Sequence, residues 1–252
     1  MKIAVCIRQV PDTASSPKIS EDGTKLDLSK LQFTINPFDE YALEEALRIK
    51  DADKETHLVV VSVGDETIIP SITKALALGV DEAIHLKPRN ASRYFDPLSI
   101  ASALADELRL HSFDLILFGK KGVDNDNAQT GTMVAQLLGI PCVPNCTSYK
   151  LSIPHITAFR EVEGGTEIYE ASLPAIITQE KGDNELRYPS LKDLISARRK
   201  TVTSKVIELR ENTIKVIGFD YPPIRAPGRI VGTGVEAIPE LVRLLREDAK
   251  VL

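Results

Sequence analysis

The feature that most constrains the fold is a regular alternation between short apolar segments and longer amphipathic ones. Four runs rich in Val, Ile, Leu and Ala have the length of buried strands: 3–7, 58–64, 83–86 and 113–118. The segments between and after them repeat apolar residues every three to four positions, as helices do: 37–49, 68–78, 97–110 and 128–138. Strands that are apolar on both faces and alternate with helices predict an α/β protein with a doubly wound parallel sheet and right-handed crossovers.

A different pattern follows residue 141. Three segments at 146–153, 156–162 and 166–172 predict an antiparallel extension, with Gly164-Gly165 as a turn, and 175–178 returns to the pattern of a core strand. Asp22-Gly23 predicts a small hairpin within 18–26. From about residue 182 the chain is polar and interrupted by prolines, with one amphipathic helix at 235–247. We therefore expect an α/β domain over 1–182 and, over 183–252, an arm that packs on something else.

Length and charge exclude several classes of protein. A chain of 252 residues buries enough surface to need neither disulfides nor metals for a stable core. With 31 Lys and Arg against 36 Asp and Glu, the net charge is −5, so nucleic acid is not an expected partner. The longest apolar runs, such as 58–63, are far shorter than a membrane span, so membrane insertion is not expected. The first residues lack a signal-peptide core.

The cysteines and histidines indicate a reducing compartment. Cys6, Cys142 and Cys146 include no CxxC pair, and the four histidines are scattered singly. This distribution is typical of a cytoplasmic protein, and it argues against a site in which cysteine and histidine hold a metal.

One loop is the best candidate for a ligand site. In an open parallel sheet, ligands bind at the carboxyl ends of the strands, near the point where the strand order reverses. Residues 119–131 leave a predicted strand and enter a predicted helix, and their main-chain N–H groups and the Thr130 hydroxyl could converge on a phosphate. The alternative is a solvated connection in which Asp126 or Asn127 simply caps the helix. Neither the dinucleotide fingerprint nor the P-loop motif occurs in the chain.

Asn36-Pro37-Phe38-Asp39 is a second candidate. Asn36 can cap a helix and Pro37 suits its first position, which explains the segment without any ligand. The Phe38 ring, in the first turn, could instead face a flat ligand. No nucleophile motif occurs, and a pair of acids such as Asp124 and Asp126 is more often a set of capping groups than a magnesium site. We therefore expect no catalytic side chain.

Six segments, in order and suitably spaced, resemble the β subunit of electron transfer flavoproteins along nearly the whole chain. They are IRQVPDT at 7–13, NPFD at 36–39 with EEA at 44–46, the loop 124–131 ending in QTG, REVEGG at 160–165, LPAIIT at 173–178 and NELRYPSL at 184–191. No single segment is specific, but the ordered set is. The resemblance favours the ligand-site interpretation of the 119–131 loop.

The resemblance implies a heterodimer in which a larger α subunit holds most of an FAD. The β subunit would bind an AMP of structural role and form part of the flavin site. The positions that match the AMP pocket are Cys6, Asn36, Asp39, Val63, Gly119, Val123, Asp124, Asn125, Asp126, Asn127, Ala128, Gln129 and Thr130. Phe38 and Thr13 would approach the flavin, although the family often has a tyrosine at the position of Thr13.

The resemblance also implies protein partners. Leu191 corresponds to the leucine of a recognition loop that enters a hydrophobic pocket on flavin-dependent dehydrogenases of the acyl-CoA type. Glu161 corresponds to a glutamate that pairs with the α subunit, and the arm over 183–252 would carry the recognition loop and pack on that subunit. Electrons would then pass to a quinone-reductase-type acceptor, as in fatty acid oxidation.

Three alternatives can be weighed from the sequence. Some relatives bind a second FAD in place of AMP and bifurcate electrons, and these tend to have valine where this chain has Thr130, whereas Ala128 is closer to their pattern. A stand-alone adenine-nucleotide sensor would explain the 119–131 loop but neither Leu191 nor the long arm. An ATP-cleaving enzyme of related fold would need a Gly- and Ser-rich loop after the first strand, where this chain has Gln9-Val10-Pro11-Asp12.

Overall fold

The computed structural model describes residues 1–15, 17–89, 95–182, 184–225 and 227–252. The chain forms two compact units. The first comprises residues 1–18 and 27–217 and contains the large sheet, and the second comprises residues 19–26 and 218–252.

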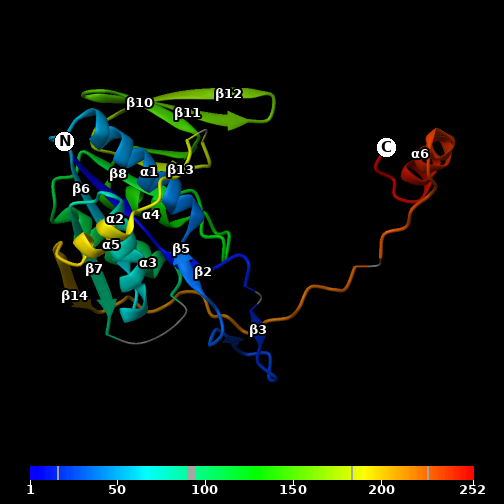
Figure 1. Ribbon diagram of the computed structural model, residues 1–252, viewed down its shortest axis with the longest axis horizontal. Coiled ribbons are helices and arrows are strands. Elements are labelled where there is room, and N and C mark those ends of the chain that lie inside the picture. Colours follow the sequence, from blue (N-terminus) through cyan, green and yellow to red (C-terminus); the bar gives the residue numbers. More distant parts are fainter. Residues whose placement is uncertain (16, 90–94, 183, 226) are drawn as a thin grey trace. The chain divides into compact units, whose positions relative to one another are not determined.

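The large sheet confirms the predicted doubly wound α/β architecture. Its seven strands are all parallel and lie in the order β14 (Val202–Ile207), β7 (Glu82–Pro88), β6 (His57–Val63), β1 (Lys2–Cys6), β8 (Leu115–Gly119), β13 (Ala175–Gln179) and β9 (Cys142–Cys146) (Figure 1). The chain builds one half of the sheet outward from β1 through β6 to β7, then returns to β8 on the other side. The strand order therefore reverses between β1 and β8, which is where ligands bind in sheets of this type.

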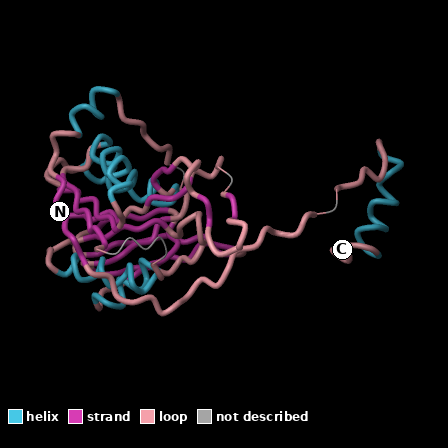
Figure 2. The backbone as a smooth tube through the Cα atoms, turned by 90° about the horizontal axis from the view of Figure 1, so that it is seen from below, coloured by secondary structure: helices cyan, strands magenta, loops and turns pink. Residues whose placement is uncertain are grey.

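Helices cover both faces of this sheet, as Figure 2 shows. They are α1 (Pro37–Ala52), a 3₁₀ turn η1 (Glu66–Ile68), α2 (Ile69–Leu78), α3 (Pro97–Arg109), α4 (Thr130–Leu138) and α5 (Leu191–Ala197). Residues of α1, α2 and α5 share one hydrophobic core with Ile3 and Val5 of β1, whereas residues of α3 and α4 share the other with Ala4 and Cys6. Alternate side chains of β1 thus enter opposite cores, which explains why the strand is apolar at every position from Ile3 to Cys6.

Smaller sheets flank the large one. The predicted antiparallel extension is present as β10 (Ser148–Ser152), β11 (His155–Val162) and β12 (Gly165–Ser172), at the top of Figure 1. The predicted hairpin is present as β3 (Lys18–Ile19) and β4 (Leu26–Asp27). The sequence did not indicate β2 (Gln9–Pro11), which pairs antiparallel with β5 (Phe33–Ile35).

The boundary that we expected after residue 182 does not coincide with the division of the structure. Residues 202–207 form β14, which pairs with β7 from Val202–Ala83 onward, and the first unit extends to residue 217. Because β14 is an edge strand with four of its six residues exposed, it carries no continuous apolar run that would mark it as part of the sheet. Asp183, the first residue of the expected arm, lies outside the described residues.

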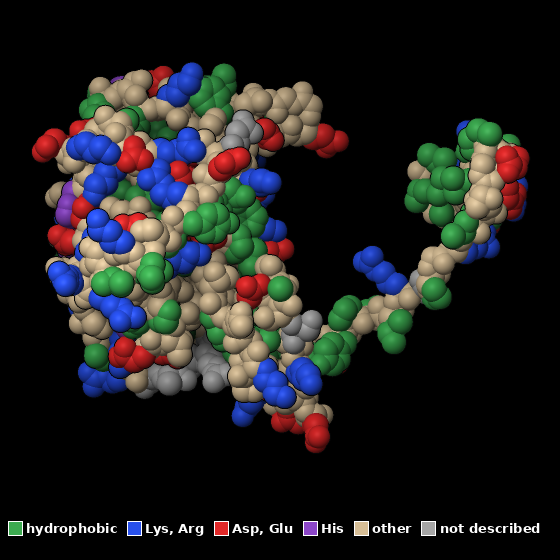
Figure 3. Space-filling view, viewed as in Figure 1, with side chains coloured by type: hydrophobic (Ala, Val, Ile, Leu, Met, Phe, Trp, Pro, Cys, Tyr) green, Lys and Arg blue, Asp and Glu red, His purple; other side chains and the backbone are tan. Residues whose placement is uncertain are grey.

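The second unit combines the hairpin with the end of the chain. The N–H of Phe219 donates to the carbonyl of Gly23 at 2.8 Å, and the N–H of Ile19 donates to the Tyr221 hydroxyl at 2.9 Å. The predicted amphipathic helix is present as a 3₁₀ turn η2 (Val235–Ala237) and α6 (Ile238–Glu247). Figure 3 shows hydrophobic side chains on one side of this element and acidic side chains on another. None of the helices in the described ranges has the length and apolarity that a membrane crossing requires.

Candidate functional site at the strand-order reversal

A single carboxylate joins β1 to β8 where the strand order reverses. Asp39 lies in the first turn of α1, and its Oδ2 accepts a hydrogen bond from the main-chain N–H of Arg8 at 2.7 Å. Its Oδ1 accepts a second from the N–H of Gly119 at 3.1 Å. Arg8 follows β1 and Gly119 ends β8. Asp39 therefore satisfies two main-chain N–H groups that have no strand partner at the carboxyl ends of these strands.

Burial controls the electrostatics of this carboxyl group. Asp39 is 6% exposed, and its removal from water raises its pKa to about 7. The hydrogen bonds from Arg8 and Gly119 act in the opposite direction but do not outweigh the loss of hydration. Asp39 therefore changes protonation state near neutral pH.

Gly119 is the residue that allows α1 to approach β8 so closely. A Cβ atom at this position would lie 2.6 Å from the main-chain nitrogen of Asp39, 2.6 Å from the carbonyl carbon of Phe38, and closer still to Asp39 Oδ1. Real Cβ contacts are not found at these separations, so any other residue would force the end of β8 away from the helix. Glycine is required at this position because α1 lies so close, and not because of its backbone conformation.

Asn36 holds the candidate loop and does not cap α1 with its side chain, so that expectation was wrong. Its Nδ2 donates to the carbonyl of Lys121 at 2.9 Å, and its Oδ1 accepts from the N–H of Val123 at 3.1 Å. Its own N–H donates to the carbonyl of Arg8 at 2.8 Å. Because Asn36 is only 1% exposed, these partners satisfy an amide group that would otherwise be buried without hydrogen bonds. Asn36 thus links the loop after β8 to the end of β1.

The two loop acids pair with cations. Asp124 forms an ion pair with Arg8, and Asp126 forms one with Lys121 at 2.9 Å. Lys121 Nζ also lies 5.8 Å from the centroid of the Phe38 ring. Across the described ranges, the carboxylate, thiol and imidazole groups form no cluster of three or more suited to a metal ion. Asp124 and Asp126 therefore hold the loop in place through ion pairs, a role that the sequence did not indicate.

The end of the loop presents unpaired polar groups. We expected α4 to start at Ala128, but it starts at Thr130 after Gln129, with no side-chain cap, so neither Asp126 nor Asn127 caps it. Within the described part of the chain, the N–H groups of Ala128 and Gln129 and the hydroxyl of Thr130 form no hydrogen bond. Ala128 adopts a φ of 52°, which is uncommon for a residue with a Cβ and concentrates at ligand sites. The arrangement suits an anion at the positive end of the α4 dipole.

The remaining predicted site residues occupy three places. Cys6 ends β1, paired with Val61 of β6 and Phe118 of β8, and burial raises the pKa of its thiol. Val63 ends β6, so it lies at the same carboxyl edge. Asn125 and Asn127 are exposed in the loop, as is Gln129, whereas Thr13 lies in an exposed turn after β2. The structure records no contact that joins Thr13 to the loop among the described residues.

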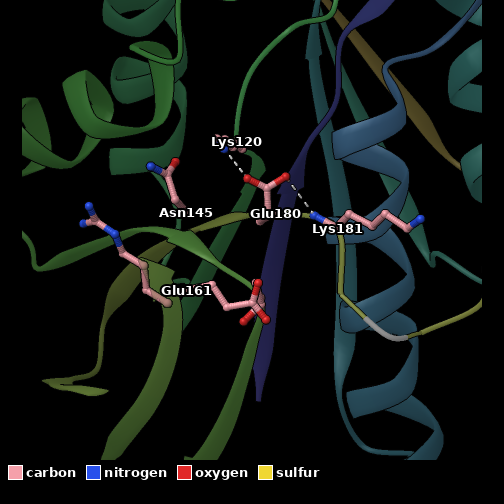
Figure 4. A pocket seen from close by; sticks show the side chains of 7 residues that line it. Lys120, Asn145, Glu161, Glu180 and Lys181 are labelled. Atoms are coloured by element: carbon pink, nitrogen blue, oxygen red, sulfur yellow. Dashed lines mark hydrogen bonds and ion pairs between the residues drawn. The ribbon is translucent and has the colours of Figure 1, made fainter. Parts of the chain in front are cut away.

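A cleft of about 410 Å³ opens beside the loop. It is lined by Lys120, Asn145, Thr147, Arg160, Glu161, Glu180 and Lys181 (Figure 4). Lys120 and Glu180 form an ion pair across it, and Glu161, on β11, is exposed. Glu161 is therefore accessible to a partner. The sequence placed Lys120 in the candidate loop but did not indicate its ion pair with Glu180, because 59 residues lie between them and only the pairing of β8 with β13 brings them together.

Leu191 is displayed at the start of α5. The hydroxyl of Ser190 accepts a hydrogen bond from the N–H of Asp193, and the Asp193 carboxylate accepts one from the N–H of Ser190, which forms a capping box. Leu194 and Ala197 pack against the core of the first unit, whereas Leu191 is 74% exposed. A large apolar side chain held outward by an ordered helix start is a feature of protein–protein contacts.

Together, the sheet and the loop define an α/β protein with an anion-suited site at its strand-order reversal. The sequence matches the family profile described as the electron transfer flavoprotein domain over residues 24–211. The chain is 34% identical to the electron transfer flavoprotein β subunit of Syntrophomonas wolfei, over 90% of this chain and 88% of that protein. It is 32% identical to the β subunit of Bradyrhizobium diazoefficiens and 34% identical to the mitochondrial β subunit of Arabidopsis thaliana, over the full length of each pair. The chain belongs to the electron transfer flavoprotein family, and it resembles the β subunits of that family from end to end.

Proposed function

We propose that the chain is the β subunit of a heterodimeric electron transfer flavoprotein. It passes electrons from flavin-dependent dehydrogenases of the acyl-CoA type to a quinone-reductase-type acceptor in the cytoplasm, and it has no catalytic side chain of its own. Full-length similarity to β subunits supports the assignment. The redox chemistry belongs to bound FAD, and the protein supplies position and electrostatics.

The observation that carries the cofactor part of this proposal is the end of the 119–131 loop. The unpaired N–H groups of Ala128 and Gln129, with the Thr130 hydroxyl, offer donors at the start of α4. A nucleoside monophosphate places its anionic group well at such a helix start. Asn36 holds the loop, and Asp39 holds the ends of β1 and β8 together, so the N–H and hydroxyl donors are already in place before a ligand binds. These residues fit AMP, and the adjoining Phe38 fits a position beside the shared FAD.

Exposed surfaces support the proposed partners. The second unit exposes Val235 in η2 and Ile238 and Leu241 in α6, and an amphipathic helix of this kind is stabilised when its apolar side packs on another chain. We assign this arm, together with Glu161, to the α subunit. Leu191 is assigned to the dehydrogenase that donates electrons.

The test is to coexpress the chain with its α subunit, purify the complex, and identify the nucleotides released by heat. One FAD and one AMP per heterodimer, with a flavin absorbance spectrum, is the expected result. Two FAD and no AMP would instead support the bifurcating type. A chain that purifies alone and binds an adenine nucleotide without flavin would overturn the proposal in favour of a nucleotide sensor.

A further inference from the structure

The segment before Leu191 is tied to α1 by a partly buried ion pair between Arg187 and Glu44. Glu44 lies in α1 and is 4% exposed. Arg187 donates to it through two side-chain nitrogens, Nε to Oε2 at 2.9 Å and Nη2 to Oε1 at 3.0 Å, and its main-chain N–H donates to Oε2 at 3.3 Å. Such a two-pronged pair fixes the orientation of the arginine as well as its position.

Two further contacts hold the same segment. Arg187 Nη2 also lies 2.9 Å from Oδ2 of Asp51, the second-last residue of α1. Asn184 donates from Nδ2 to the carboxylate of Glu45. Residues 184–190 contain no helix or strand, so these side-chain contacts, and not a backbone ladder, order the segment.

The ion pair lies close to the proposed recognition leucine. Tyr188, Pro189 and Ser190 are the only residues between Arg187 and Leu191, and Ser190 belongs to the capping box that starts α5. Displaying an apolar side chain for docking costs free energy if its segment must be ordered during binding. A segment that is already fixed in the free protein avoids that cost.

We propose that the Arg187–Glu44 pair is a positioning device that orders residues 184–190, and so sets the affinity of the Leu191 surface for the donor dehydrogenase. This inference rests on the proposed function, because it assumes that Leu191 contacts a dehydrogenase. Arg187 acts through Leu191 and does not itself need to touch the partner.

Arg48 provides a matched control within the same cluster. Its Nε donates to Glu44 Oε1 at 3.1 Å, so it neutralises the same carboxylate as Arg187. It lies on α1 itself, and no hydrogen bond or ion pair joins it to residues 184–190 within the described structure. Replacing Arg48 perturbs Glu44 without releasing the segment.

The experiment uses the coexpressed heterodimer and a purified acyl-CoA dehydrogenase reduced by its acyl-CoA substrate. The variants are Arg187→Gln, Arg187→Lys, Arg48→Gln, Leu191→Ala, and the double variant Arg187→Gln/Leu191→Ala. For each we measure kcat and the KM for the heterodimer as electron acceptor, together with flavin content and the extent of flavin reduction by dithionite. Flavin content and reduction by dithionite report on the integrity of the heterodimer, because neither requires docking to the dehydrogenase.

We expect Arg187→Gln to raise KM by roughly three- to tenfold, with kcat, flavin content and dithionite reduction unchanged. Arg187→Lys should raise KM less than Arg187→Gln does, because lysine keeps the positive charge but cannot make the two-pronged contact of the guanidinium group. Arg48→Gln should leave KM unchanged. In the Leu191→Ala background, Arg187→Gln should have no further effect, because the surface that it positions is gone.

Three outcomes would overturn the inference. If Leu191→Ala raises KM while Arg187→Gln does not, the positioning role is wrong and the proposed function stands. If Arg48→Gln raises KM as much as Arg187→Gln, the effect belongs to the stability of Glu44 and not to the segment. If Leu191→Ala leaves KM unchanged, the docking role of Leu191 in the proposed function fails, and the positioning role fails with it.

Discussion

Replacing Gly119 by alanine tests the central claim about the strand-order reversal. The added Cβ would lie 2.6 Å from the Asp39 nitrogen and 2.6 Å from the Phe38 carbonyl carbon, both of which are main-chain atoms that cannot rotate away. The end of β8 must therefore move from α1, and the 3.1 Å hydrogen bond from the Gly119 N–H to Asp39 must lengthen or break. The variant thus combines crowding with a damaged buried contact.

The magnitude follows from these two effects. Overpacking of a well-filled site costs about 2 kcal/mol. The loss of a hydrogen bond to a buried carboxyl group costs about 2 kcal/mol more. A loss of about 4 kcal/mol in the free energy of unfolding should lower the melting temperature of a chain of this size by roughly 8–16 °C.

The assay is thermal denaturation of the purified heterodimer, with the content of bound nucleotide measured alongside. Gly165→Ala is the control, because a Cβ there meets nothing within 4 Å and its φ lies outside the left-handed region. That change should shift the free energy of unfolding by less than about 1 kcal/mol. A Gly119→Ala complex that melts within about 2 °C of the wild type would refute the close-approach argument.

Three further predictions concern the same site. Thr130→Val keeps the shape of the side chain and removes the hydroxyl, so the purified heterodimer should retain less AMP by mass analysis, and unchanged AMP content would count against a phosphate at α4. Asn36→Ala should leave α1 intact, since the side chain does not cap it. The change removes two hydrogen bonds to the loop, so amide hydrogen exchange at Val123 should become faster, with about 2 kcal/mol less protection. Equal exchange rates in both proteins would show that Asn36 does not hold the loop. Because the folded pKa of Asp39, about 7, exceeds its ordinary value of 3.8, the folded chain binds the extra proton between these values, and the stability due to this group falls as pH rises through that window. Melting curves from pH 5 to 8 should therefore show a weaker fall with pH in Asp39→Asn than in the wild type, and superimposable pH profiles would contradict the buried titration.

The sheet could be predicted where the sequence carries the burial pattern itself. Ile3 to Cys6 and the run at 58–63 are apolar at nearly every position because both faces are covered, so their strands were identified with bounds within a residue or two. The edge strands were harder. In β9, Pro144 interrupts the apolar pattern, and in β14 most side chains are exposed, so neither resembles a core strand.

The loop at 119–131 was chosen from the sequence as the candidate site, but the contacts that hold it in place were not predicted. Asn36 suggested a local helix cap, whereas its partners Lys121 and Val123 lie more than 80 residues away in the chain. Arg8 belongs to the 7–13 segment that carries the resemblance, but its ion pair with Asp124 could not be predicted, since it spans 116 positions. Local patterns report helix starts and buried strands, and contacts between distant loops appear only once the sheet has brought them together.

The position of β14 has a consequence for how the chain is made. Its neighbour β7 ends at Pro88, and β14 begins only at Val202, so roughly 110 residues must be synthesised before the outer edge of β7 is paired. At typical rates of translation this takes on the order of 5–20 s, during which a row of main-chain donors and acceptors is open to any other extended segment. The nascent protein is therefore most vulnerable to misassociation along the edge of β7 that β14 later covers.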